Sequence, residues 1–158
     1  MIKVLVAEAH PIIRQGLQEL LQEIGEIVVA GEASDGMEVL KAISKDDYDL
    51  ILLDNSLPNR NGPDILRHVK REKPDLKVLI LGAYPEEQYA VRAIKEGASG
   101  YLTKERAPEE LLTAIRKIAL GEKYVSSLLA GKFIFDLKAR SPELESVALS
   151  EKPDTFVG

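Results

Sequence analysis

The chain has no cysteine and no long apolar run. Without thiols it can form neither disulfides nor cysteine-ligated metal sites. Its hydrophobic stretches have the length of strands, far below the ~20 residues that span a bilayer. The N-terminus lacks the basic segment, apolar segment and small-residue cleavage site of a signal peptide. These absences predict a cytoplasmic protein that does not enter a membrane.

The chain also lacks an excess of positive charge, because its 26 acidic residues outnumber its 21 lysines and arginines. The formal net charge is -5 and the sequence pI is about 5.2, which argues against a broad nucleic-acid footprint of clustered Lys and Arg. With 158 residues, 45% of them hydrophobic, the chain can bury one core and carry a short appendage. One domain with a tail is the expectation.

Two hydrophobic patterns, one typical of buried strands and one typical of helices, alternate along the first 121 residues. Short apolar runs predict buried strands, and the segments between them repeat apolar residues at helical spacing. Prolines at 11, 63, 85 and 108 favour helix starts, and glycines at 25, 97 and 121 favour helix ends. We therefore predict a doubly wound α/β fold, a five-stranded parallel sheet in order 2-1-3-4-5. The expected strands are Val4 to Ala7, Ile27 to Ala30, Leu50 to Leu53, Val78 to Leu81 and Tyr101 to Thr103.

Ligands of such sheets bind beyond the carboxyl ends of the strands. The residues that follow the expected strands are Glu8, Asp54, Gly82 and Lys104, so two acids and a lysine should converge at one edge. The loop "DNSLPNRNG" is rich in turn residues and should hold Asp54 at an exposed mouth rather than in the core. A carboxylate beside a lysine suits phosphoryl transfer through an aspartyl-phosphate.

Three segments in this order, "AEAHP", "LILLDNSLPNRNG" and "GASGYLTKE", resemble the receiver domain of bacterial two-component response regulators, a CheY-like, flavodoxin-like fold. The resemblance covers about residues 1–121, and Pro58 and Gly62 match the family's loop. The Ala-His-Pro triplet and "VAGEASDGMEVL" are similar to the NarL/FixJ group, whose receivers precede a LuxR-type helix-turn-helix. The resemblance implies a sensor histidine kinase as partner, a role in transcription regulation, and no enzymatic turnover.

The resemblance also assigns roles to individual residues. It makes Asp54 the phosphoacceptor, Lys104 the lysine that pairs with the phosphoryl group, and Tyr101 the aromatic switch. It implies Mg²⁺ as cofactor, held by Glu8, Asp54 and the backbone carbonyl of Ser56. These roles come from the family pattern and not from spacing alone.

Two positions depart from that pattern. Ala9 stands where receivers have a second acid that binds Mg²⁺ directly, and Gly82 stands where they have a Thr or Ser hydroxyl. Mg²⁺ prefers octahedral oxygen ligands that include carboxylates, so we expect weak or absent metal binding, with Glu8 more distant. Glu8 could instead be a solvated acid, and Tyr101 ordinary packing. His10 is expected at a helix N-terminus and not as a metal ligand, because no second His or Cys is spaced to assist it.

Residues 122–158 have a different composition. They mix one apolar segment, Phe133 to Leu137, with Pro, Ser and charged residues, which is typical of a linker. "ALSEKP" resembles at most a fragment of the opening of a helix-turn-helix domain, so DNA contact is expected only through a domain absent from this chain. The apolar segment lacks a partner within a receiver, which favours a two-fold homodimer or a tail swapped between two copies.

Three functions are open at this stage. A phosphorylated receiver is the family default, whereas Ala9 and Gly82 favour a pseudo-receiver that works as a phosphorylation-independent protein-interaction module. A flavodoxin-like cofactor binder or small hydrolase would need a Gly/Ser/Thr-rich phosphate loop after the first strand or a second catalytic acid after Asp54, and neither "AEAHP" nor "DNSLP" provides one.

Overall fold

The structure is a computed structural model that describes residues 1–83 and 87–125. Pro85 and the segment Phe133 to Leu137 lie outside these residues, so the predictions for them are not tested. Strands and helices alternate throughout, in the order β1 (Ile2–Ala7), α1 (Pro11–Gln22), β2 (Ile27–Ala33), α2 (Gly36–Lys45), β3 (Leu50–Asp54), α3 (Gly62–Glu72), β4 (Lys77–Gly82), α4 (Glu87–Lys95), β5 (Gly100–Thr103) and α5 (Ala107–Ala119).

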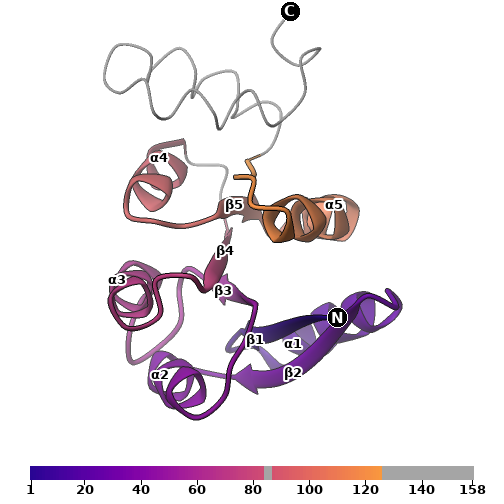
Figure 1. Ribbon diagram of the computed structural model, residues 1–158, viewed down its shortest axis with the longest axis horizontal. Coiled ribbons are helices and arrows are strands. Elements are labelled where there is room, and N and C mark those ends of the chain that lie inside the picture. The colour runs from indigo at the N-terminus through magenta and orange to yellow at the C-terminus, as the bar shows by residue number, and fades with distance from the viewer. Residues whose placement is uncertain (84–86, 126–158) are drawn as a thin grey trace, which may run out of the picture.

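The sheet has five parallel strands in the order β2-β1-β3-β4-β5, as predicted. Helices α2, α3 and α4 cover one face, and α1 and α5 cover the other (Figure 1). Successive residues of each strand point to opposite faces. In β1, for example, Leu5 packs with α2, α3 and α4, whereas Val4 and Val6 pack with α1 and α5. Because both faces are covered, the strands are apolar throughout rather than alternating.

The element boundaries follow local chemistry. Prolines occupy the first turns of α1, α3 and α5, where their missing amide hydrogen is not needed. Gly97 and Gly121 follow α4 and α5 with φ angles of 109° and 94°, the left-handed conformation that favours glycine. The strands are one to three residues longer than predicted at one or both ends, because polar residues such as Lys77 and Glu32 also pair in the ladder.

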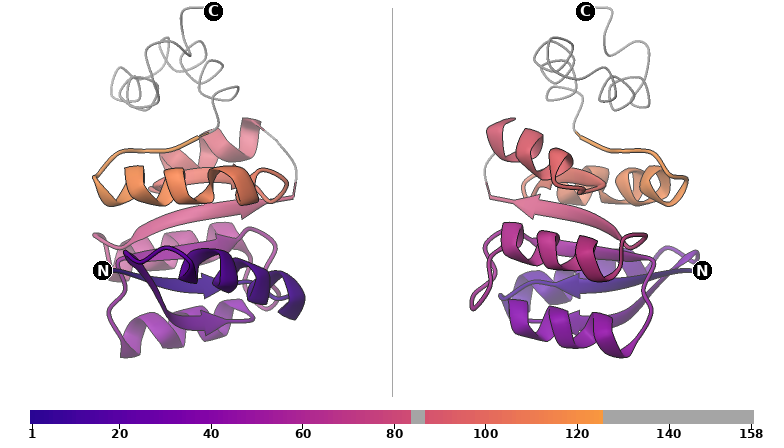
Figure 2. Two further views of the ribbon diagram at one scale, coloured as in Figure 1. Left: turned by 90° about the vertical axis from the view of Figure 1, so that its right-hand side faces the viewer. Right: turned by 60° about the vertical axis from the view of Figure 1, so that its left-hand side comes forward.

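All five strands run in the same direction, so their carboxyl ends meet at one edge of the sheet (Figure 2). No helix in the described ranges is long and apolar enough to span a membrane. The edge at the carboxyl ends holds the residues that the sequence singled out.

Candidate functional site

Glu8, Asp54 and Lys104 meet at the carboxyl edge of the sheet, as predicted. Glu8 follows β1, Asp54 ends β3 and Lys104 follows β5. The Lys104 Nζ atom lies 3.0 Å from Glu8 Oε1 and 3.2 Å from Asp54 Oδ1. Two carboxylates thus share one ammonium group, and the three side chains together carry one net negative charge.

Both acids are more deeply buried than the sequence suggested. Only 1% of Glu8 and 2% of Asp54 is exposed, so the prediction of an exposed Asp54 was wrong, as was the alternative reading of Glu8 as a solvated acid. Asp54 is the last residue of a central strand that is buried along its whole length. The turn residues begin only after it, and one of them, Ser56, donates hydrogen bonds back to its carboxylate.

The two oxygens of Asp54 have different environments. Oδ1 accepts hydrogen bonds from the Ser56 amide at 3.1 Å and the Ser56 hydroxyl at 3.2 Å. Oδ2 is buried and accepts no hydrogen bond from any residue in the described ranges. An orphaned, buried carboxylate oxygen is unfavourable, and its presence beside a lysine indicates a site that is completed by another group. Ser56 therefore contacts Asp54 through its amide and hydroxyl, while a role for its carbonyl stays a prediction.

Glu8 is held by the residues that follow it. The His10 amide donates to Glu8 Oε2 at 3.0 Å, and His10 Nδ1 lies 3.0 Å from the same oxygen. Arg14 donates to the Glu8 carbonyl at 2.8 Å. Burial alone would raise the pKa of Glu8, but the hydrogen bonds from His10 and the contact with Lys104 lower it overall. Glu8 is therefore held as a carboxylate.

Lys104 responds to the same arrangement. Burial alone would lower the pKa of its ammonium group, but the hydrogen bond to Glu8 and the charges of Asp54 and Glu8 raise it overall. The amine therefore stays protonated and neutralises part of the negative charge at the edge. A protonated lysine next to an unsatisfied carboxylate oxygen is an arrangement that can receive an anionic phosphoryl group.

Gly82 and Tyr101 are neighbours at this edge. They lie on the adjacent strands β4 and β5, and Tyr101 is 1% exposed. A Cβ atom at position 82 would come within 2.6 Å of Tyr101 Cζ and still closer to the hydroxyl. The buried tyrosine therefore occupies the space of a side chain at position 82. A threonine at position 82 would therefore fit only if Tyr101 moved.

Ala9 has no metal-binding group, and it packs, half-buried, against the core beneath α2, α3 and α4.

His10 is the N-cap residue of α1 by position, as predicted, but its side chain makes no capping hydrogen bond. The ring instead lies beside Glu8, and Glu8, His10 and Asp54 each offer a ligand atom within 4.8 Å of the others. The sequence predicted that Glu8 and Asp54 meet but did not place His10 with them, because the residue pattern alone does not show that the ring turns back toward Glu8.

The donors present fit a divalent cation. The buried, unpartnered Asp54 Oδ2 and the second carboxylate of Glu8 supply oxygen ligands, which Mg²⁺ prefers. A bound cation would neutralise negative charge at the carboxylates. The acidic pair is thus present, although Ala9 removes the third carboxylate that the family pattern implies.

Comparisons with known proteins agree with the fold. Residues 4–116 match the family described as response regulator receiver domain. The response regulator UvrY of Escherichia coli K12 is 32% identical over 153 residues, covering 96% of this chain and 70% of UvrY. The response regulator GacA of Pseudomonas aeruginosa PAO1 is 34% identical over 143 residues, covering 90% of this chain and 66% of GacA.

A solved structure shows the same architecture. The signal receiver domain of the response regulator NarL from Mycobacterium tuberculosis superposes with a TM-score of 0.72 at 30% identity, covering 77% of this chain and 98% of that domain. The relatives are of the LuxR/NarL type that "AEAHP" and "VAGEASDGMEVL" indicated. With its 2-1-3-4-5 sheet and its two acids and lysine at one edge, this chain belongs to the response regulator receiver family of two-component systems.

Proposed function

We propose that Asp54 is the phosphoacceptor of this receiver and that a sensor histidine kinase supplies the phosphoryl group. In this reaction an Asp54 oxygen attacks phosphorus, the bond from phosphorus to the kinase histidine nitrogen breaks, and an aspartyl-phosphate forms. The observation that carries the proposal is the unpartnered Oδ2 of Asp54. The other carboxylate oxygen, Oδ1, is already held by Ser56 and Lys104. Because Oδ2 is buried, the donor must displace the residues that cover it.

In this proposal Lys104 pairs with the transferred phosphoryl group and Tyr101 couples the site to the α4 face. Mg²⁺ would be held by Glu8, Asp54 and the Ser56 carbonyl, weakly because Ala9 provides no ligand. The chain then works as a stoichiometric phosphoryl acceptor in the cytoplasm and not as an enzyme. Control of transcription would pass through a helix-turn-helix domain outside residues 1–125.

A second function is favoured by Gly82. Tyr101 already fills the space next to position 82, so its buried conformation does not depend on a hydroxyl that moves toward a phosphoryl group. A receiver with its aromatic residue fixed in this way would present one surface around α4 and β5 at all times. Such a chain would act as a phosphorylation-independent protein-interaction module.

We also propose that the chain forms a homodimer through α1 and α5. Ile12 and Leu120, on and beside these helices, are 86% and 79% exposed. A groove of about 330 Å³ between the helices is lined mainly by apolar side chains, among them Ile13 and Leu20. Light scattering of Ile12→Glu should show more monomer than the unsubstituted chain at equal concentration. A monomer in both cases would contradict the proposal.

One experiment separates the two functions. The full chain is incubated with acetyl phosphate and Mg²⁺, and its intact mass is followed with time. Phosphorylation at Asp54 predicts a mass increase of one phosphoryl group that is absent in Asp54→Asn. Ala9→Asp should increase the rate and extent, because it adds a carboxylate ligand. If neither the unsubstituted chain nor Ala9→Asp gained a phosphoryl group, Asp54 would be rejected as a working phosphoacceptor. The interaction module would then be the remaining proposal.

A further inference from the structure

The ring of His10 lies at the phosphoryl-acceptor site, next to a carboxylate that is already part of it. His10 Nδ1 is 3.0 Å from Glu8 Oε2, and Glu8, His10 and Asp54 each place one ligand atom within 4.8 Å of the other two. Among the residues that the structure describes, no other group of three His or acidic side chains meets this condition. An imidazole nitrogen therefore joins two carboxylate oxygens around one point.

The environment of the three groups is that of a cation site. Asp54 Oδ2 is buried and without a hydrogen-bond donor among the described residues. Lys104 neutralises only one of the two carboxylates, so one negative charge remains for a cation to balance. Glu8 and Asp54 are almost fully buried while 69% of the His10 side chain is exposed. The ring is thus the solvent-exposed member of the group, and an incoming ion can reach it.

We propose that His10 is a metal ligand of this chain and that it changes the preference of the site from Mg²⁺ toward first-row transition-metal ions such as Co²⁺ or Zn²⁺. Carboxylate and water ligands suit Mg²⁺, whereas imidazole suits the transition metals. A chain with Ala9 in place of an acid, and His10 beside Glu8, exchanges an oxygen donor for a nitrogen donor. The proposal rests on the same two carboxylates as the proposed function, but it adds a ligand and a different class of ion.

The alternative is that His10 only orients Glu8. Its amide and ring both approach Oε2, and an orienting contact of this kind would support any cation that Glu8 binds. The two roles differ in what they predict for Mg²⁺. A positioning residue affects Mg²⁺ and Co²⁺ alike, while a nitrogen ligand affects Co²⁺ selectively.

The test is calorimetric titration of the full chain with Co²⁺ and, separately, with Mg²⁺, without a phosphoryl donor. Removal of even an outer-shell partner lowers metal affinity by about 10-fold to 100-fold, so His10→Asn should weaken Co²⁺ binding at least about tenfold. Mg²⁺ binding should change by less than about twofold. Asparagine keeps the backbone amide that donates to Glu8 and has no imidazole nitrogen.

The chain offers a matched control, because it contains just two histidines. His68 lies on α3, where its ring contacts Arg71, and His68→Asn should leave both affinities unchanged. In that variant the remaining imidazole signals in a proton NMR spectrum belong to His10. Added Co²⁺ should shift or broaden them at metal concentrations near the calorimetric Kd.

Any one of three results would overturn the inference. The first is that His10→Asn loses Co²⁺ and Mg²⁺ affinity equally, and the second is that His68→Asn loses as much Co²⁺ affinity as His10→Asn. The third is that the His10 signals do not respond to bound Co²⁺. None of these readouts involves phosphorylation. Failure of Asp54 to accept a phosphoryl group would therefore leave the metal inference intact, and failure of the metal inference would leave Asp54 as a candidate phosphoacceptor.

Discussion

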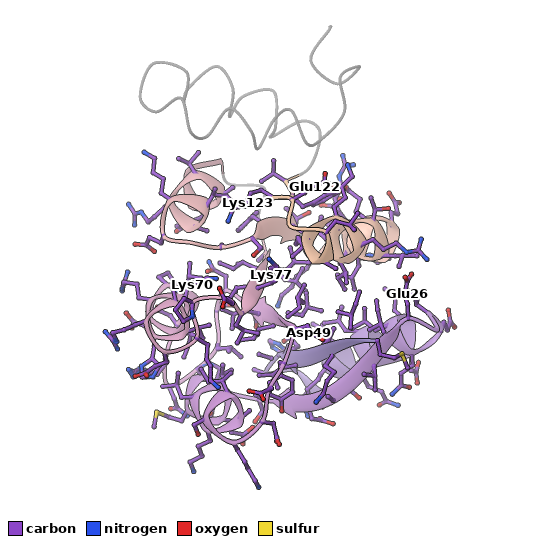
Figure 3. The ribbon with its side chains drawn as sticks, viewed as in Figure 1. Glu26, Asp49, Lys70, Lys77, Glu122 and Lys123 are labelled. Carbon is purple, nitrogen blue, oxygen red and sulfur yellow. The ribbon has the colours of Figure 1, made fainter. Side chains whose placement is uncertain are left out.

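The two edges of the sheet contain similar charged residues in different environments. At the carboxyl edge, Glu8 and Asp54 are buried and share Lys104. The opposite edge, which Figure 3 views with its charged side chains labelled, carries Asp49, Lys70 and Lys77. A cavity of about 620 Å³ opens there, larger than the groove of about 330 Å³ between α1 and α5. Yet its charged groups form ordinary structural contacts.

The charged side chains at the opposite edge form hydrogen bonds with backbone amides and carbonyls. Asp49 accepts a hydrogen bond from the Lys3 amide at 2.8 Å, and Lys70 donates to the carbonyls of Pro74 and Leu76 at 3.1 and 2.7 Å. Burial and the nearby ammonium groups of Lys123 and Lys77 lower the pKa of Lys70. Neither buried, unpartnered carboxylate oxygens nor acid clusters of metal-binding geometry occur among the described residues of this edge. Unsatisfied buried charge, and not cavity volume, marks the functional edge.

The largest expected effect comes from removing the shared lysine. Lys104→Met leaves two buried carboxylates without their cation, and breaking a buried ion pair costs about 3 kcal/mol or more. We expect the free energy of unfolding at pH 7 to fall by about 2 to 3 kcal/mol, since Lys104 keeps some contact with solvent. Urea unfolding followed by circular dichroism measures it. Lys73→Met at the opposite edge, paired with the exposed Asp47, should change stability by less than about 0.5 kcal/mol. If both variants lost the same free energy of unfolding, the two edges would not differ in this respect.

The next effect concerns the space between Gly82 and Tyr101. Gly82→Ala places a methyl group against the Tyr101 ring, and overpacking of this kind costs about 1 to 3 kcal/mol. In Gly82→Ala/Tyr101→Leu the two losses should be less than additive, because the smaller side chain makes room. Gly16→Ala, in an open position on α1, should instead stabilise by about 0.5 kcal/mol. Additive losses in the double variant would show that the two residues do not compete for space.

A smaller effect is expected on how the free energy of unfolding changes with pH, and its direction follows from the pKa shifts. The folded chain lowers the pKa of Glu8 below 4.5, so the stabilising contribution of Glu8 is present above that pH and is lost as pH falls through the lowered value. Lys104 has a raised pKa, so its contribution is present below pH 10.5 and is lost as pH rises through the raised value. Urea unfolding at several pH values should show a shallower acid slope in Glu8→Gln than in the unsubstituted chain.

The smallest effect is expected for a surface pair at the opposite edge. Glu26 and Arg116 form an ion pair, but both side chains are about half exposed. Exposed pairs contribute about 0 to 1 kcal/mol and are screened by salt. Glu26→Gln should therefore lower the free energy of unfolding by less than about 0.5 kcal/mol, and by less still in 0.5 M salt, an ionic strength at which the screening length is only on the order of 4 Å. A larger loss would mean that this pair, and not only the carboxyl edge, supports the fold.

The sequence determined the topology and the composition of the site. The apolar runs fixed which segments are strands, and right-handed crossovers then brought Glu8, Asp54 and Lys104 to one edge. Local periodicity is sufficient for these conclusions, because a parallel sheet puts every strand's carboxyl end on the same side. The departures at Ala9 and Gly82 were also visible in the sequence.

Only the tertiary structure decided how these residues interact. Asp54 is buried at the end of a central strand, and the grouping of the His10 ring with both carboxylates depends on the pairing of β1 with β3. The position of Tyr101 over Gly82 likewise arises from the pairing of β4 with β5. Solvation and side-chain contact are properties of neighbours in space, so a sequence pattern that identifies each residue cannot specify which oxygen is left without a partner.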